Sequence, residues 1–204
     1  MSLAKPADQF TRVLKSLNCD GRWGFALLTI CVLLVLLEFG GDHARALLRY
    51  DRTAIEMGEW WRLVTAHFVH LGLEHAVLNA LGLVLMWALF ARDYSARAWL
   101  VILAASIAAI DAGLWIRGST LEWYVGSSGV LHGVLAAGTL AHLRRRDLDG
   151  WILAVFLVAK LLYEQFSGSL PFADQAPVVV DAHLYGAAGG LLAAFGLSAR
   201  TASL

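Results

Sequence analysis

Six apolar stretches divide the chain, and charged or turn-forming residues separate them. A helix needs about 20 apolar residues to cross the hydrocarbon core of a bilayer. The stretches are Trp23–Leu37, His75–Ala91, Ala98–Ile116, Trp123–Leu143, Gly150–Ala173 and Ala182–Ala199. Because only short segments connect them, the pattern predicts an all-α membrane protein, a six-helix bundle in a single domain over residues 1–204. Residues 1–22 are the expected leader, residues 23–199 the six-span core, and residues 40–70 the first outer loop.

Composition supports a membrane protein and excludes several other classes. Hydrophobic residues make up 59% of the chain and charged residues only 16%, against roughly 25% charged residues in soluble domains. A disordered chain, a disulfide scaffold and an ordinary soluble domain are therefore excluded. The formal net charge of zero does not indicate a general nucleic-acid binder.

Basic residues in the connecting segments predict the orientation of the spans. With the N-terminus in the cytoplasm, the inner segments carry ten Lys and Arg residues and the outer segments five, with Arg144-Arg145-Arg146 as the strongest inner cluster. We therefore expect both termini in the cytoplasm. The first span follows a basic leader, as in a signal peptide, but no Ala-x-Ala cleavage site follows it, so it is expected to be retained.

The first outer loop carries charges of both signs and ends in Trp60-Trp61-Arg62. Tryptophan is enriched at the membrane–water interface. The loop is therefore predicted to be an amphipathic segment lying on the membrane surface.

Polar residues that are costly inside a membrane gather at one predicted depth. His70, His75 and Asn79 lie at the outer entry of the second span, Ser128 opens the fourth, and His183 opens the sixth. Ionisable groups within a membrane bundle are functional-site candidates. The predicted topology therefore indicates a site at the outer ends of these three spans.

A serine and a histidine at this depth allow nucleophilic catalysis. A histidine can remove the proton that makes a serine hydroxyl a weak nucleophile. Free N–H groups at a helix N-terminus, where Ser128 is expected, can stabilise an oxyanion. His75 and Asn79 share a helix face at i and i+4 and could complete an oxyanion hole.

Small residues favour close packing of the two helices that would carry this pair. Gly129-x-x-x-Gly133 and Gly186-x-x-x-Gly190 are spaced to let helices approach closely. We therefore expect the fourth and sixth spans to bring Ser128 and His183 within hydrogen-bonding distance.

With these blocks in order, the sequence resembles the rhomboid family of intramembrane serine proteases. The matching blocks are Trp61-Arg62, then His70, His75 and Asn79, then Gly126-Ser127-Ser128-Gly129, and finally Ala182-His183. The resemblance implies a rhomboid-like bundle that hydrolyses a peptide bond in or near a substrate's transmembrane segment, without metal, ATP or another cofactor.

The resemblance also implies roles for individual residues. Ser128 would be the nucleophile and His183 the general base. His75, Asn79 and the backbone around Gly126 and Ser128 would support the oxyanion. Trp61, Arg62 and His70 would order the first loop.

One departure from the family pattern is informative. Four residues after the nucleophile, rhomboids commonly carry a tyrosine beneath the catalytic histidine, whereas this chain has His132. With the short chain, this block resembles the rhombosortase branch, which implies a protease of the bacterial inner membrane with its site toward the periplasm. Its substrates would be exported surface proteins bearing a C-terminal Gly-Gly motif, an apolar helix and a basic tail. His132 itself could support His183, compete as the base, or only pack.

Other polar residues have simpler interpretations. Lys160 and Glu164, four apart in the fifth span, are expected to form a structural pair, with a role in binding a charged substrate tail or in gating as the alternative. Asp181 lies on a different helix face from His183, so a Ser–His dyad is expected. The segment 167–180 is expected to be a loop or a mobile cap. His67, His70 and His75 lack the spacing of a metal motif, so no metal is expected.

Two other functions compete with proteolysis. A non-catalytic binder or chaperone of membrane helices would not depend on Ser128. A haem-binding or proton-coupled bundle would use the histidines across facing spans, and nothing in their spacing favours it.

Overall fold

The computed structural model describes residues 23–117, 121–169 and 179–198, so the predicted leader lies outside the described residues. The first half contains α2 (Gly24–Glu38), α3 (Gly41–Leu48), α4 (Arg52–Glu56), α5 (Arg62–Thr65) and α6 (Leu73–Phe90). The second half contains α7 (Ala96–Arg117), α8 (Ser128–Arg144), α9 (Leu148–Ser167) and α10 (Asp181–Phe195). Two short strands, β1 (Tyr50–Asp51) and β2 (Trp123–Tyr124), pair antiparallel.

Each of the six predicted spans coincides with a helix, but some boundaries were wrong. The fourth predicted span corresponds to α8, which begins at Ser128 rather than Trp123, because Trp123 and Tyr124 pair with the first loop as β2. The fifth ends at Ser167 rather than Ala173, and Gly168 follows with φ +83°, a conformation that glycine adopts without strain.

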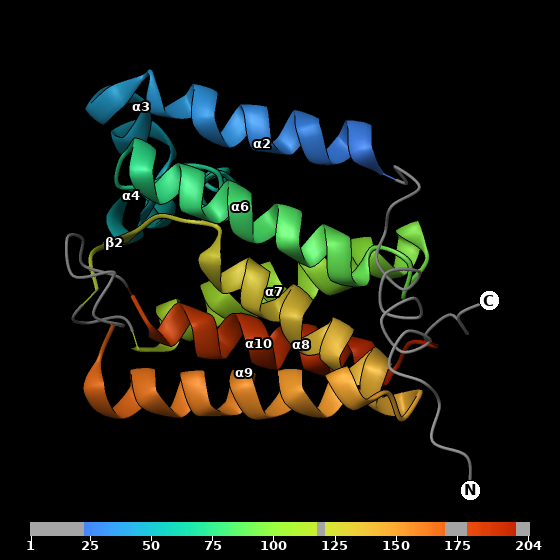
Figure 1. The fold of residues 1–204 in the computed structure, drawn as a ribbon. Coiled ribbons are helices and arrows are strands. Elements are labelled where there is room, and N and C mark those ends of the chain that lie inside the picture. Colours follow the sequence, from blue (N-terminus) through green and yellow to red (C-terminus); the bar gives the residue numbers. More distant parts are fainter. Residues whose placement is uncertain (1–22, 118–120, 170–178, 199–204) are drawn as a thin grey trace, which may run out of the picture.

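The helices differ in whether their length and apolar composition are sufficient to span a membrane. Among the described residues, α6, α7 and α9 are each long and apolar enough, and α2 with α3 makes a fourth candidate bent by 114°. Helices α8 and α10 are shorter, at 17 and 15 residues. Twelve residues of α8 are buried but only three of α9, so α8 is the central helix and α9 a peripheral one. Figure 1 shows α8 and α10 in the middle of the bundle, with α2 and α9 on opposite sides.

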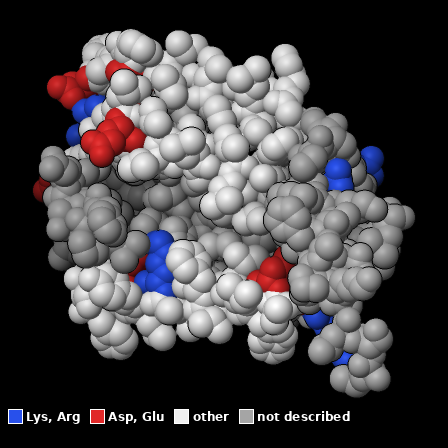
Figure 2. Space-filling model, in the orientation of Figure 1, with Lys and Arg blue, Asp and Glu red and all other residues white. Residues whose placement is uncertain are grey.

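The outer surface of the bundle is apolar. Exposed large side chains on α9 include Trp151, Val155, Phe156 and Leu162, and α2 and α6 carry similar residues. On the face in Figure 2, charged side chains lie mainly toward the ends of the helices, and a broad area over α2 and α6 carries none. This distribution suits a bundle surrounded by lipid.

Glycines allow α8 and α10 to pack backbone to backbone, as their spacing predicts. A Cβ atom added to Gly129 would lie 2.8 Å from the carbonyl oxygen of Ala182. A Cβ atom on Gly186 would overlap the carbonyl oxygen of Gly129, and one on Gly190 would overlap that of Gly133. The two helices therefore touch where only hydrogen atoms fit between their backbones.

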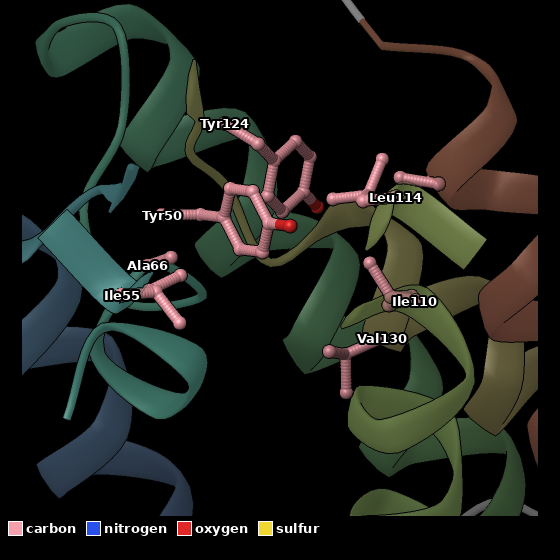
Figure 3. Packing of buried hydrophobic residues seen from close by; sticks show 8 residues of the cluster. Tyr50, Ile55, Ala66, Ile110, Leu114, Tyr124 and Val130 are labelled. Carbon is pink, nitrogen blue, oxygen red and sulfur yellow. The ribbon is translucent and has the colours of Figure 1, made fainter. Parts of the chain in front are cut away.

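The first outer loop is not the single amphipathic segment that its composition indicates. It folds into α3, β1, α4 and α5, and an apolar cluster anchors it to the bundle. Figure 3 shows Tyr50 and Tyr124 side by side, near Ile110 and Leu114 of α7 and Val130 of α8. The loop thus packs on the ends of the helices that carry the polar residues.

Candidate active site

Ser128 and His183 meet at the N-terminal ends of α8 and α10. The Ser128 hydroxyl lies 2.9 Å from Nε2 of His183. Both residues occupy the first turn of their helices, and the glycine contacts one turn further along hold the helices close. The side chain of His183 is 6% exposed, so protein surrounds the pair.

The other nitrogen of His183 contacts a carboxylate. Nδ1 lies 2.9 Å from Oε2 of Glu164, which projects from α9. Because a carboxylate accepts hydrogen bonds and does not donate them, Nδ1 carries the proton of a neutral ring. Nε2 then has a free lone pair directed at Ser128, which is the tautomer that can accept the hydroxyl proton.

His132 lies under His183 rather than beside the serine hydroxyl. The two imidazole rings stack with centroids 4.2 Å apart and planes inclined by 17°. Nδ1 of His132 donates to the carbonyl oxygen of Ser128 at 2.7 Å, which assigns it the Nδ1–H tautomer. These contacts favour the supporting position over competition as the base.

Ser127, next to the nucleophile candidate, joins three parts of the site. Its hydroxyl donates to Oδ1 of Asn79 on α6 at 3.1 Å and lies 3.2 Å from Nε2 of His70. Asn79 also donates one N–H to the carbonyl of His75 in its own helix at 2.9 Å. Asn79 therefore orders the loop before α8 in this structure, and its expected role at an oxyanion stays a prediction.

His75 lies over the backbone of Gly126. A Cβ atom at Gly126 would be 3.2 Å from Cε1 of the His75 ring, and Gly126 has φ +119°. A side chain here is therefore disfavoured both by the close contact with His75 and by the backbone conformation. The amide of Leu71 donates to Nδ1 of His75 at 3.4 Å. Nε2 is therefore the protonated nitrogen and is able to donate a hydrogen bond at the site.

The expected loop-ordering residues hold the first outer loop in different ways. Arg62 is buried and donates to the carbonyls of Ala46 and Arg49 and to Glu59. Trp61 is half exposed and donates to the carbonyl of Leu47.

His70 is fully buried at the junction between the loop and the bundle. Its amide donates to Glu38 and its carbonyl accepts from Arg45. Burial, with a smaller effect of nearby His75, lowers the pKa of His70 to about 3.

Comparison with known proteins decides the family. The chain matches the Rhomboid domain over residues 57–200. The chain belongs to the rhomboid family. It is 25% identical over 138 residues to "Putative rhomboid protease YdcA" of Bacillus subtilis (strain 168), covering 68% of this chain and 67% of that protein. It is 29% identical over 127 residues to "Rhomboid protease GluP" of the same organism, covering 60% of this chain but only 24% of that protein.

Membership makes this chain a rhomboid-type serine peptidase of the membrane. Rhomboid proteases cleave membrane protein substrates. The N-terminal ends of α6, α8 and α10 lie at the same end of the bundle as the first loop (Figure 1). Around these ends lie the polar residues that the sequence predicted for the site: His70, His75, Asn79, Ser128, His132 and His183.

Sequence reasoning about this rhomboid missed the contact of Glu164. The expected pair with Lys160 is confirmed, with 2.5 Å between Nζ and Oε1, but the second carboxylate oxygen also reaches His183. The expectation of a Ser128–His183 dyad did not include this contact of Glu164. Asp181 pairs with Arg117.

Two sets of potential metal ligands occur among the described residues of this rhomboid. His132, Glu164 and His183 offer ligand atoms within 4.8 Å of one another, as do His142, Asp147 and Asp149. In the first set the two rings stack face to face and Lys160 already neutralises Glu164. That arrangement disfavours a second cation.

Proposed function

We propose that this rhomboid is an intramembrane serine endopeptidase in which Ser128 is the nucleophile and His183 the general base. The 2.9 Å contact between Ser128 Oγ and His183 Nε2 carries the proposal. It has the geometry that proton transfer from an attacking hydroxyl requires.

The reaction proceeds in two halves. Ser128 Oγ attacks the carbonyl carbon of the scissile peptide bond while His183 Nε2 takes the hydroxyl proton. The tetrahedral intermediate collapses, the C–N bond breaks, and His183 returns the proton to the leaving amine. Water, deprotonated by His183, then hydrolyses the acyl-enzyme and releases the new carboxyl terminus.

The oxyanion is stabilised by donors at the start of α8 and on α6. The first-turn N–H groups of α8 have no partner within the helix, and the ring of His75 presents its protonated Nε2 beside Gly126. Such donors contribute to the rate because they are held in place before charge develops.

The chain would cross the membrane six times with both termini in the cytoplasm and the site toward the periplasm of a bacterial inner membrane. Helices α8 and α10 would cross as short helices that other helices surround. Their burial and their small contact residues support this arrangement. The basic cluster Arg144-Arg145-Arg146 lies at the C-terminal end of α8 and would face the cytoplasm.

The substrates would be exported surface proteins with a C-terminal Gly-Gly motif, an apolar helix and a basic tail. Support comes from the resemblance of the Gly-Ser-Ser-Gly-Val-Leu-His-Gly block to the rhombosortase branch, and from the packing of His132 in that block against His183.

Labelling with a fluorophosphonate probe tests the nucleophile. Ser128→Ala and His183→Ala should lose labelling, while Ser106→Ala, which removes another buried helical hydroxyl, should keep it. Labelling that survives Ser128→Ala would contradict the assignment.

Cleavage of a reporter tests the substrate class. A membrane-anchored reporter with a Gly-Gly tail should be cut by the wild-type protein and not by Ser128→Ala. A matched reporter with Val-Val in place of Gly-Gly should resist. Equal cleavage of both reporters would contradict the Gly-Gly specificity while leaving the mechanism intact.

A further inference from the structure

Glu164 occupies a position on α9 where an apolar residue is expected. The three buried residues of this helix are Gly150, Leu157 and Glu164, spaced seven apart. That spacing places them on one stripe, which is the face that α9 turns to the protein. A carboxylate on the buried stripe of a membrane helix is costly unless it has partners, and such a residue is a candidate for a functional role.

Both oxygens of this carboxylate are engaged. Oε2 accepts from Nδ1 of His183 at 2.9 Å and Oε1 accepts from Nζ of Lys160 at 2.5 Å. The side chain of Glu164 is 3% exposed and that of Lys160 is 16% exposed. Lys160 thus supplies the opposite charge that a buried carboxylate needs. By binding one oxygen, it also holds the carboxylate with its other oxygen toward His183.

We infer that Glu164 is a positioning residue that holds His183 in its Nδ1–H tautomer, and that Lys160 holds Glu164 in place. The active site is then a Ser128–His183–Glu164 triad in which the carboxylate orients the imidazole and does not take up the proton. The inference rests on the proposed function of Ser128 and His183. His132 stacks on one face of the His183 imidazole, and Glu164 accepts a hydrogen bond from its Nδ1. Together these contacts hold the ring in the orientation in which Nε2 faces Ser128.

Glu164→Gln tests the positioning role because it keeps the size of the side chain. Lys160 still needs an acceptor and takes the amide oxygen, so the NH₂ group faces His183 Nδ1. Nδ1 must then accept, the proton moves to Nε2, and the ring can no longer act as a base. We expect kcat for reporter cleavage to fall by roughly 10²–10⁴-fold, as for wrong-tautomer variants of serine proteases, with KM nearly unchanged.

A second substitution separates this role from a purely structural ion pair. In Glu164→Gln with Lys160→Met, the amide can turn its oxygen toward Nδ1–H, which restores the productive tautomer. We expect the double variant to recover at least about tenfold in kcat over Glu164→Gln alone. A structural ion pair predicts no recovery. The double variant also leaves no unpaired charge on the stripe, so it should fold.

Three controls give each outcome a clear meaning. Asp181→Asn removes another carboxylate near His183, one that pairs with Arg117, and should keep wild-type cleavage. Ser128→Ala in the same assay reports on the proposed function alone: if it still cleaves, that function fails. Thermal unfolding in detergent identifies variants that do not fold.

If Ser128→Ala is inactive but Glu164→Gln keeps activity within about threefold of wild type, the triad is wrong and the dyad stands. If the folded double variant is no more active than Glu164→Gln, the positioning role of Glu164 is wrong as well.

Discussion

The imidazole rings of His132 and His183 are stacked 4.2 Å apart and are inclined by only 17°. His132 is one turn after Ser128 on α8, and its Nδ1 donates to the Ser128 carbonyl. One residue therefore braces both members of the proposed catalytic pair, the base through its ring face and the nucleophile through its backbone.

Replacing His132 separates these two contacts. His132→Phe should keep the ring stack and lose the hydrogen bond to Ser128, whereas His132→Ala loses both. We expect kcat for reporter cleavage to fall by about tenfold or more in His132→Ala and by a smaller factor in His132→Phe. Equal losses in the two variants would show that the stacked ring does not position His183.

The contact between α8 and α10 should not tolerate a single methyl group. In Gly186→Ala the new Cβ would overlap the carbonyl oxygen of Gly129, so the helices must separate. We expect a loss of about 1–3 kcal/mol in the free energy of unfolding, together with weaker fluorophosphonate labelling. Gly196→Ala, whose Cβ would lie 3.7 Å from the Ala193 carbonyl, is the matched control and should behave as wild type.

Arg62 should resist replacement by lysine. Its guanidinium donates to two loop carbonyls at 2.7 and 3.0 Å and to Glu59, a set of directions that one ammonium group does not reproduce. We expect Arg62→Lys to lower the free energy of unfolding by roughly 1–3 kcal/mol. Arg117→Lys alters an exposed arginine that pairs with Asp181 and should leave the free energy of unfolding nearly unchanged. Similar effects of the two substitutions in unfolding assays would contradict the anchoring role of Arg62.

His70 should make stability depend on pH. Burial lowers its pKa in the folded protein to about 3, while the unfolded chain has a pKa near 6.5. The unfolded state therefore binds the proton first, and the free energy of unfolding falls as pH drops from about 6.5 toward about 3, by at most about 1.4 kcal/mol per pH unit. Above about pH 6.5 this group contributes no pH dependence.

Unfolding at several pH values checks this prediction. His70→Gln should flatten the acid side of the stability profile, because the titrating group is gone. His43→Gln changes an exposed histidine on α3 and should leave the profile unaltered. An unchanged profile in His70→Gln would mean that another group is responsible.

Much of the arrangement follows from local pattern. The apolar runs predicted six helices because length and polarity alone decide which segments can remain in lipid. The glycine spacing predicted the contact between α8 and α10, because a helix places residues four apart on one face. Ser128 and His183 lie together, as expected, because both open helices at the same end of the bundle.

Other features depended on how the helices are rotated about their axes. The sequence showed Lys160 and Glu164 as a pair within one helix, but whether Glu164 also reaches His183 depends on which side of α9 faces α10. The seven-residue spacing of Gly150, Leu157 and Glu164 was a signal for that side, but a weak one, because apolar residues occur all round α9 and do not mark the side that faces the protein.

By itself the sequence determined the six apolar helices, the contact between the glycine-bearing pair and the gathering of the polar residues at one end of the bundle. Only the tertiary structure decided the β1–β2 pairing, the network around Ser127 and the contact between Glu164 and His183. The first set depends on spacing along one helix or on transfer of a segment into lipid. The second depends on hydrogen bonds of a few ångströms between residues distant in the chain, whose geometry exists only after the helices have packed.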